Sequence, residues 1–407
     1  MLRIRAFKGL RPEASLVRDV TCVPYDVVDR SEAAELAGGK PDSLLHVDRA
    51  EIDLPEDCDP YSAAVYETAR EAFLSLQQRQ VLVRERDECV YLYRQTMGGH
   101  EQLGVAAVCH IEDYESDIIK KHEKTRRDKE DDRTKLIDTL SANTGPVFLT
   151  YRGTDEINTL TARFQGGEAP LFDFAAPDGV QHTVWRVVGG GDFIEAFSRV
   201  PAAYVADGHH RTASAVRVGR ERRAANPKHD GTEDYNWFLA VLFPDSQLQI
   251  LPYNRAVRDL NGITGERFFD AVRQAFTVTP DVSASPARPG DIRMYFDRSW
   301  WGLAWEAPGN SSPIERLDVT AVQERLLRPV LGVEDPRTSK RIQFIGGIRG
   351  TSELEELVNS GRAAVAFSMF PTTVDQLMEI ADAGEIMPPK STWFEPKLRS
   401  GLFVHTF

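Results

Sequence analysis

The chain has 407 residues, of which 42% are hydrophobic and 27% are charged, as in ordinary globular proteins. This length corresponds to two or three structural units, because domains average roughly 150 residues. The 62 acidic and 49 basic residues give a net charge of −13. Such a charge argues against non-specific nucleic-acid binding, which requires a surplus of Lys and Arg. The net negative charge does not exclude a local basic pocket for a small phosphorylated ligand.

The cysteine pattern and the N-terminal sequence bear on where the protein resides. The 4 cysteines are scattered and form no CxxC pair, which predicts free thiols rather than a zinc ribbon or a disulfide scaffold. Arg3 and Arg5 interrupt the start of the chain, so we expect no signal peptide. No apolar run approaches the ~18–20 residues that cross a bilayer. We therefore expect a cytoplasmic protein that binds no membrane, and leave its oligomeric state open.

Helical and strand patterns alternate from the first half of the chain onwards. Residues 61–79 carry apolar side chains from Val65 to Leu76 at helical spacing. Gly98 and Gly99 separate two strand patterns, which predicts a β-hairpin. Up to residue 252 the sequence predicts strands at 81–84, 89–94 and 103–111, a helix after the charged residues 120–132, a strand at 146–151, a helix at 192–197, a strand at 203–206 followed by a helix, and strands at 238–243 and 249–252.

The second half of the chain contains the best candidate for a linker. Residues 279–289 are rich in Pro and Ser and lack a periodic pattern. We therefore predict one region at 1–278 and a second at 290–407, in an α+β protein with mixed sheets. Beyond residue 252 the predicted elements are a helix at 265–276, strands at 292–296 and 302–305, helices at 319–331 and 352–360, a strand at 363–367 and a helix at 374–383.

The most informative segment is the turn between the strand at 203–206 and the helix after it. Asp207 stands where a helix N-cap would lie, and Gly208 permits a tight turn. The first amides of the helix lack intrahelical partners and form an anion site, where His209, His210 and Arg211 can bind phosphate oxygens. An ordinary Asp cap followed by exposed polar residues is the alternative. A metal bound by the two histidines is disfavoured, since adjacent helical residues do not face each other.

A second candidate segment begins with His122 and Glu123. It starts like the zinc motif H-E-x-x-H, but Arg126 occupies the position of the second histidine, so the sequence predicts no zinc site of that type. A cluster that mixes His, Glu, Asp and Arg can supply a general base and magnesium ligands. A solvated charged helix face is the alternative.

A third segment is the tail at 387–397, which is rich in Pro, Lys and aromatic residues. Lys390 precedes Ser391 and Thr392 there, but the glycines of a P-loop are missing. By composition alone the segment is an irregular surface tail.

Four separated stretches together resemble the family catalogued as domain of unknown function 1015. The resemblance covers nearly the whole chain, and the turn at 207–211 is similar to the phosphate-binding turn of the ParB/sulfiredoxin superfamily, which includes kinases for free L-serine. The four stretches are Val-Pro-Tyr-Asp-Val at 23–27, His-Glu-Lys-Thr at 122–125 with Asp132, Arg133 and Asn143, Asp-Gly-His-His-Arg at 207–211, and the tail at 387–397.

This resemblance implies a fold and a function. Residues 1–278 would contain a ParB/sulfiredoxin-like nucleotide-binding and catalytic core, and residues 290–407 a C-terminal α/β extension with a tail that could return to the site. The implied reaction transfers a phosphoryl group from ATP or ADP, with Mg²⁺, to free L-serine, which gives O-phosphoserine. A ParB-like nucleotide-binding switch without metabolite kinase activity is the alternative. In both cases the partners are small molecules rather than nucleic acid.

The resemblance also implies roles for particular residues. Glu123 would be the base that accepts the serine hydroxyl proton, with His122 beside it. Asp207 would orient the site or bind magnesium through water, and no metal ligand is firmly assigned. Arg133 and Lys390 would neutralise phosphate or the substrate carboxylate. The nucleotide phosphates would be held by Gly208, His209, His210, Arg211 and Thr212.

Overall fold

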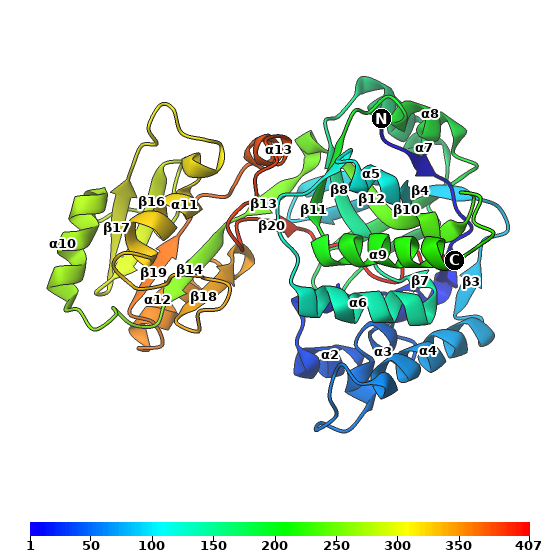
Figure 1. Cartoon of the computed structure of the whole chain (residues 1–407), viewed down its shortest axis with the longest axis horizontal. Helices are drawn as coiled ribbons and strands as arrows, with labels where there is room; N and C mark the ends of the chain where they lie inside the picture. Colours follow the sequence, from blue (N-terminus) through cyan, green and yellow to red (C-terminus); the bar gives the residue numbers. More distant parts are fainter. The chain divides into compact units, whose positions relative to one another are not determined.

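The computed structural model describes residues 1–407 and divides into two compact units (Figure 1). Unit 1 comprises Met1–Leu248 together with Pro396–Phe407, and unit 2 comprises Gln249–Glu395. Both combine helices with β-sheets, and the main sheet of unit 1 contains parallel and antiparallel pairs. The predicted α+β class with mixed sheets is therefore confirmed. No helix in the chain is both long and apolar enough to cross a bilayer.

Unit 1 is built on a nine-stranded sheet. Its strand order is β6-β11-β8-β12-β5-β4-β10-β9, with β1 paired to β5. The predicted hairpin is confirmed as β4 and β5, and both glycines of its turn have positive φ. The strands are β1 (Ile4–Arg5), β4 (Cys89–Met97), β5 (His100–His110), β6 (Ile119–Lys120), β8 (Val147–Tyr151), β9 (Phe172–Ala175), β10 (Gln181–Val188), β11 (Ala203–Asp207) and β12 (Trp237–Pro244).

The centre of this sheet is covered on both faces, so its strands are continuous apolar runs. Every residue of β8 is buried, as is every residue of β12 after Trp237. Helix α9 (His209–Ala225) packs on β8 and β12, helix α6 (Arg127–Leu140) packs along α9, and helix α4 (Ala63–Gln78) packs on α6 (Figure 1). The helices therefore form successive layers outward from the sheet.

Most of the remaining elements of unit 1 are short, apart from the 13-residue helix α7. Two small two-stranded sheets each pair segments that are far apart in the sequence. In one of them, the end of the chain pairs with the segment after α6. These elements are helices α1 (Val17–Val20), α2 (Arg30–Ala37), α3 (Leu45–Asp48), α5 (Ile111–Glu115), α7 (Asp155–Gly167) and α8 (Gly191–Phe197), and the strand pairs β2 (Leu10–Pro12) with β3 (Leu82–Arg84) and β7 (Ala142–Asn143) with β21 (His405–Thr406).

Unit 2 is built on an antiparallel six-stranded sheet with the order β15-β17-β16-β19-β14-β18. Phe268, Val272 and Phe367 belong to its buried apolar core. Its elements are β13 (Gln249–Leu251), β14 (Tyr253–Val257), α10 (Gly265–Ala275), β15 (Thr277–Pro280), β16 (Asp291–Phe296), β17 (Ser299–Ala304), α11 (Asp318–Val322) with a π-helical continuation (Gln323–Leu327), β18 (Ile342–Gly346), α12 (Ser352–Asn359), β19 (Val365–Ser368), α13 (Val374–Asp382) and β20 (Trp393–Glu395).

The two compact units differ from the predicted regions at 1–278 and 290–407. The predicted linker at 279–289 overlaps the last two residues of β15 and leads to β16, and both of these strands pair with β17 in one sheet. A Pro- and Ser-rich composition is typical of any surface loop, so it does not distinguish a loop within a sheet from a link between domains. The division lies instead at 248/249 and 395/396.

Candidate functional site

The turn between β11 and α9 has the geometry that its sequence indicates. Gly208 follows the last residue of β11 and has a φ of +89°. Residues other than glycine adopt this backbone conformation only with strain. A Cβ atom at Gly208 would lie 3.0 Å from Nε of Arg211, whose guanidinium folds back over the turn. The pairing of β11 with β8 shifts register between Val205 and Asp207, and such bulges often re-aim a side chain beside a functional site.

The first turn of α9 presents free backbone donors. The first intrahelical bond runs from the Thr212 amide to the Gly208 carbonyl at 2.9 Å. The amides of His209, His210 and Arg211 precede that bond and donate to no group of the chain. At the positive end of a 17-residue helix, they form an anion site. The Thr212 hydroxyl also donates to the Gly208 carbonyl, at 3.0 Å, so both donors of Thr212 are engaged within the turn.

Asp207 is held by a lysine from the end of the chain. The Nζ atom of Lys397 lies 3.0 Å from Oδ2 of Asp207, and the Gly208 amide donates to Oδ1 at 2.8 Å. Burial acts to raise the pKa of Asp207, but the cations of Lys397 and Arg211 hold it well below its usual range. The carbonyl of Lys397 accepts a 2.8 Å bond from the fully buried Gln95, which fixes the lysine in place.

Arg211 is a buried cation at the same turn. Its Nη1 donates to the carbonyl of Pro146 at 2.5 Å, while its buried Nε has no partner. Burial acts to lower the pKa of Arg211, but the carboxylates of Asp26 and Asp207 outweigh it and raise the pKa. Asp26 lies in the 3-10 turn Tyr25–Val27, where it is exposed. Because its charge acts on Arg211, the 23–27 motif lies near the start of α9.

The strand pairing of β6 brings the His122–Glu123 segment to this turn. β6 runs parallel to β11, with Ile119 opposite Ala203, so the residues after β6 continue beside the end of β11. The rings of His122 and His209 meet edge to face, with centroids 4.5 Å apart. Ligand atoms of His122, Glu123 and His209 all lie within 4.8 Å of one another. The predicted catalytic pair and the predicted phosphate turn are therefore one cluster.

His210 and Arg133 make structural bonds that the sequence did not indicate. The Nε2 atom of His210 accepts a 2.9 Å bond from the Arg126 amide, and an acceptor nitrogen cannot donate to a phosphate at the same time. Burial lowers the pKa of His210, which favours this neutral form. The guanidinium of Arg133 lies 2.8 Å from the Asp132 carboxylate and 4.1 Å over the ring of Tyr25.

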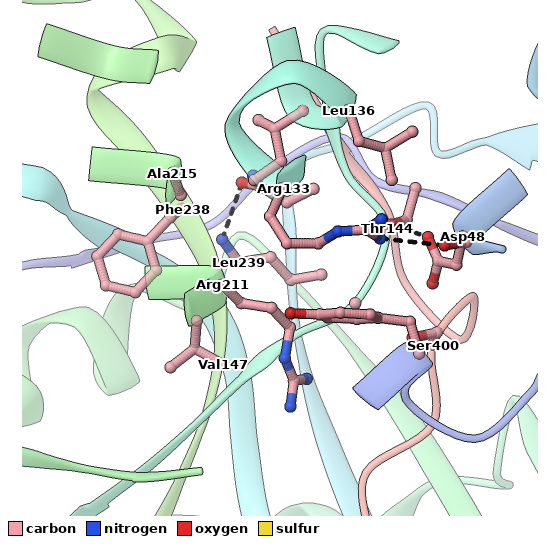
Figure 2. A pocket seen from close by; sticks show the side chains of 14 residues that line it. Asp48, Arg133, Leu136, Thr144, Val147, Arg211, Ala215, Phe238, Leu239 and Ser400 are labelled. Carbon is pink, nitrogen blue, oxygen red and sulfur yellow. Dashed lines mark hydrogen bonds between the residues drawn. The ribbon is translucent and has the colours of Figure 1, made fainter. Parts of the chain in front are cut away.

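Arg133 also lines a small interior cavity (Figure 2). Its Nη1 donates to the carbonyl of Asp48 at 3.0 Å, and Thr144 donates to the Asp48 carboxylate at 2.6 Å. Arg211 lines the same cavity, whose volume of about 30 Å³ has room for water but not for a substrate. Lys390 belongs to unit 2, where its cation lies 5.6 Å from the ring centre of Tyr253. The roles of Arg133 and Lys390 toward a substrate stay predictions.

Lys397 is the residue that sequence reasoning missed. It is the last residue of the 387–397 stretch, one of the four stretches that resemble the family. Its place in that stretch was the only feature of the sequence that could have pointed to a role at the site. The segment with Lys397 is anchored by Arg399, which pairs with Asp178 and donates from Nε to Nε2 of His182 at 3.2 Å. The Tyr93 hydroxyl lies 2.7 Å from Nδ1 of the same ring.

This anchor makes stability depend on pH. Burial, with a contribution from Arg399, lowers the pKa of His182 to about 3. Between that value and the unfolded pKa of about 6.5, the unfolded chain binds more protons, so stability falls as the pH falls. The free energy of unfolding of the parent should fall with decreasing pH more steeply than that of His182→Gln, by up to about 1.4 kcal/mol per pH unit. Urea unfolding at several pH values below 6.5 tests it, and equal slopes for parent and variant would contradict it.

Comparison with known proteins assigns the family. The chain matches the family described as "Protein of unknown function (DUF1015)" over residues 4–320, which is most of its length. The chain therefore belongs to this family, and the resemblance found in the sequence is confirmed. A search of curated proteins finds no match.

Several solved structures are similar to parts of the chain. A free serine kinase variant in complex with AMP has 14% identity and a TM-score of 0.37, with 74% of this chain and 92% of that chain covered. SbnI with a C-terminal truncation from Staphylococcus aureus has 13% identity and a TM-score of 0.37, with 73% and 87% covered. A conserved hypothetical protein from Pyrococcus furiosus has 12% identity and a TM-score of 0.36, with 74% and 95% covered.

Proposed function

We propose that the protein is a kinase that transfers a phosphoryl group from ATP or ADP to free L-serine, from a ParB/sulfiredoxin-like core in unit 1. One observation carries the proposal: the open amides at the start of α9 share one cluster with the buried cation of Arg211 and the carboxylate of Glu123. Phosphoryl transfer mainly requires positioning and charge neutralisation, and these groups can supply both.

The nucleotide phosphates would bind at the start of α9. Three unpaired amides and the helix dipole favour an anion there, and a guanidinium can form two parallel hydrogen bonds with phosphate oxygens. Gly208 contributes by the absence of a side chain, which lets a phosphate approach the backbone. His209, His210 and Arg211 would contribute their amides, and Arg211 would also contribute its cation.

Glu123 would accept the proton of the acceptor hydroxyl. The serine oxygen forms the new bond to the terminal phosphorus, the bond from that phosphorus to the bridging oxygen of the nucleotide breaks, and the hydroxyl proton moves to the carboxylate. Asp207 is the other nearby carboxylate, but its lowered pKa makes it a weaker base. Its pairing with Lys397 suits a positioning role.

Magnesium would reach the site with the nucleotide. Mg²⁺ prefers oxygen ligands and keeps several waters, whereas the cluster beside the turn offers two imidazoles for one carboxylate. This donor set does not fit magnesium. The phosphate oxygens of the nucleotide provide the ligands that Mg²⁺ prefers, and the chain's amides and Arg211 would then hold the complex.

The charges around the turn suit a zwitterionic acceptor. Asp26 can pair with an α-ammonium group, and the cation of Lys397 can pair with an α-carboxylate. Removing either group from the acceptor forfeits a charged hydrogen bond worth about 1.5–3 kcal/mol. We expect kcat/KM for ethanolamine and for 3-hydroxypropionate to be roughly tenfold to a hundredfold below that for serine.

Mass spectrometry of the phosphorylated products, with the three acceptors in parallel reactions, tests this assignment. Serine preference would support an amino-acid site. Equal rates with all three acceptors would point to a different acceptor, and nucleotide binding without any phosphorylated product would point to a nucleotide-dependent switch.

A further inference from the structure

We infer that His122, Glu123 and His209 bind one divalent transition-metal ion of the zinc type. Their ligand atoms all lie within 4.8 Å of one another. A tetrahedral zinc site with bonds of about 2.0–2.1 Å places neighbouring ligand atoms roughly 3.3 Å apart. Small side-chain rotations toward a common centre therefore complete the site. This inference goes beyond the proposed phosphoryl transfer and does not depend on it.

The two imidazoles are buried without hydrogen bonds that would explain them. His122 is 1% exposed and His209 is 7% exposed. Neither ring nitrogen of His122 nor Nε2 of His209 makes a hydrogen bond of good geometry, although the backbone of Val205 lies close to the His122 ring. A buried polar group without a partner is costly, and in native structures it is a sign of an additional ligand or ion. A metal ion at the centre of the cluster satisfies one nitrogen of each ring.

The side chains of the cluster suit metal binding. The two imidazoles offer nitrogen lone pairs, and the Glu123 carboxylate adds a negatively charged oxygen ligand.

The donor set selects the kind of ion. Two nitrogens and one carboxylate suit zinc and its neighbours in the transition series rather than magnesium or calcium. Three protein ligands leave a coordination position open for water or for an oxygen of a bound molecule.

The test is a metal titration of the full-length protein after treatment with a chelator, without nucleotide. Cobalt(II) is the probe, because four- or five-coordinate Co²⁺ absorbs visible light more strongly than the hydrated ion. We expect one tightly bound Co²⁺ per chain, displaced by Zn²⁺. His122→Gln and His209→Gln should each weaken binding by about a hundredfold or more. His46→Gln is the matched control and should bind like the parent, since its ring pairs with Asp53.

Thermal unfolding with and without Zn²⁺ gives a second measurement. A ligand that binds only the folded state raises Tm, so Zn²⁺ should stabilise the parent and the His46 control but much less the conservative variant Glu123→Gln. That variant keeps the shape of the site, and so carries the test if a histidine variant fails to fold. A parent that binds no Co²⁺, or full-affinity binding in folded variants at all three positions, would overturn the inference. Neither result would affect kinase assays with magnesium and nucleotide.

Discussion

Replacement of Glu123 by Gln should lower turnover by about 10²- to 10⁴-fold while nucleotide affinity stays close to that of the parent. The serine hydroxyl is a weak nucleophile and loses its proton as the bond to phosphorus forms. Glutamine keeps the shape of the side chain but cannot accept that proton. Initial rates of O-phosphoserine formation measure the first quantity, and titration calorimetry measures the second. The rates are measured with magnesium as the only divalent ion, after transition metals have been removed. A lower rate of the variant then cannot result from the loss of a transition-metal ligand.

Asp207→Asn is the matched control, because Asp207 is the other carboxylate at the turn. Its bond to the Gly208 amide can persist in the amide variant, but its ion pair with Lys397 cannot. We expect lower stability and a smaller loss of turnover than for Glu123→Gln. If Asp207→Asn abolishes turnover and Glu123→Gln does not, the base is Asp207 and the role assigned to Glu123 is wrong.

Arg211→Ala should weaken nucleotide binding roughly tenfold to a hundredfold, because it removes a charge-assisted contact worth about 1.5–3 kcal/mol. The variant also loses the bond to the Pro146 carbonyl, so its folding is checked by thermal unfolding. Arg211→Lys keeps the charge without the planar fork and should recover part of the affinity. Calorimetry at two salt concentrations is the measurement, with weaker binding expected at high salt. Unchanged affinity in a folded Arg211→Ala variant would exclude a phosphate contact.

Local patterns predicted the elements around the site well. The strand, turn and helix at 203–212 were predicted because a short apolar run, a glycine and a helical pattern follow one another directly. The hairpin at Gly98 and Gly99 was predicted for the same reason. By contrast, the short helices α2 and α3 were not predicted, because too few apolar positions define a helical period there.

The parts of the site that could not be predicted depend on pairing between distant segments. His122 meets His209 because β6 pairs in parallel with β11, and a two-residue strand has almost no sequence signal. The zinc motif fails in sequence at Arg126, yet the fold brings a second histidine from α9 to the same place. Lys397 reaches Asp207 from 190 residues away. Charged residues in such positions look like surface residues until the partner is known.

The most direct test of the proposed function follows the terminal phosphoryl group of the nucleotide and identifies the molecule that receives it. The full-length protein is incubated with magnesium, free L-serine and either ATP or ADP, and the mixture is followed by phosphorus NMR. We expect an O-phosphoserine resonance that grows as the terminal phosphate of one nucleotide disappears, in equal amounts, and that is absent without serine. Formation of inorganic phosphate alone, or no change in either nucleotide, would contradict the assignment as a serine kinase.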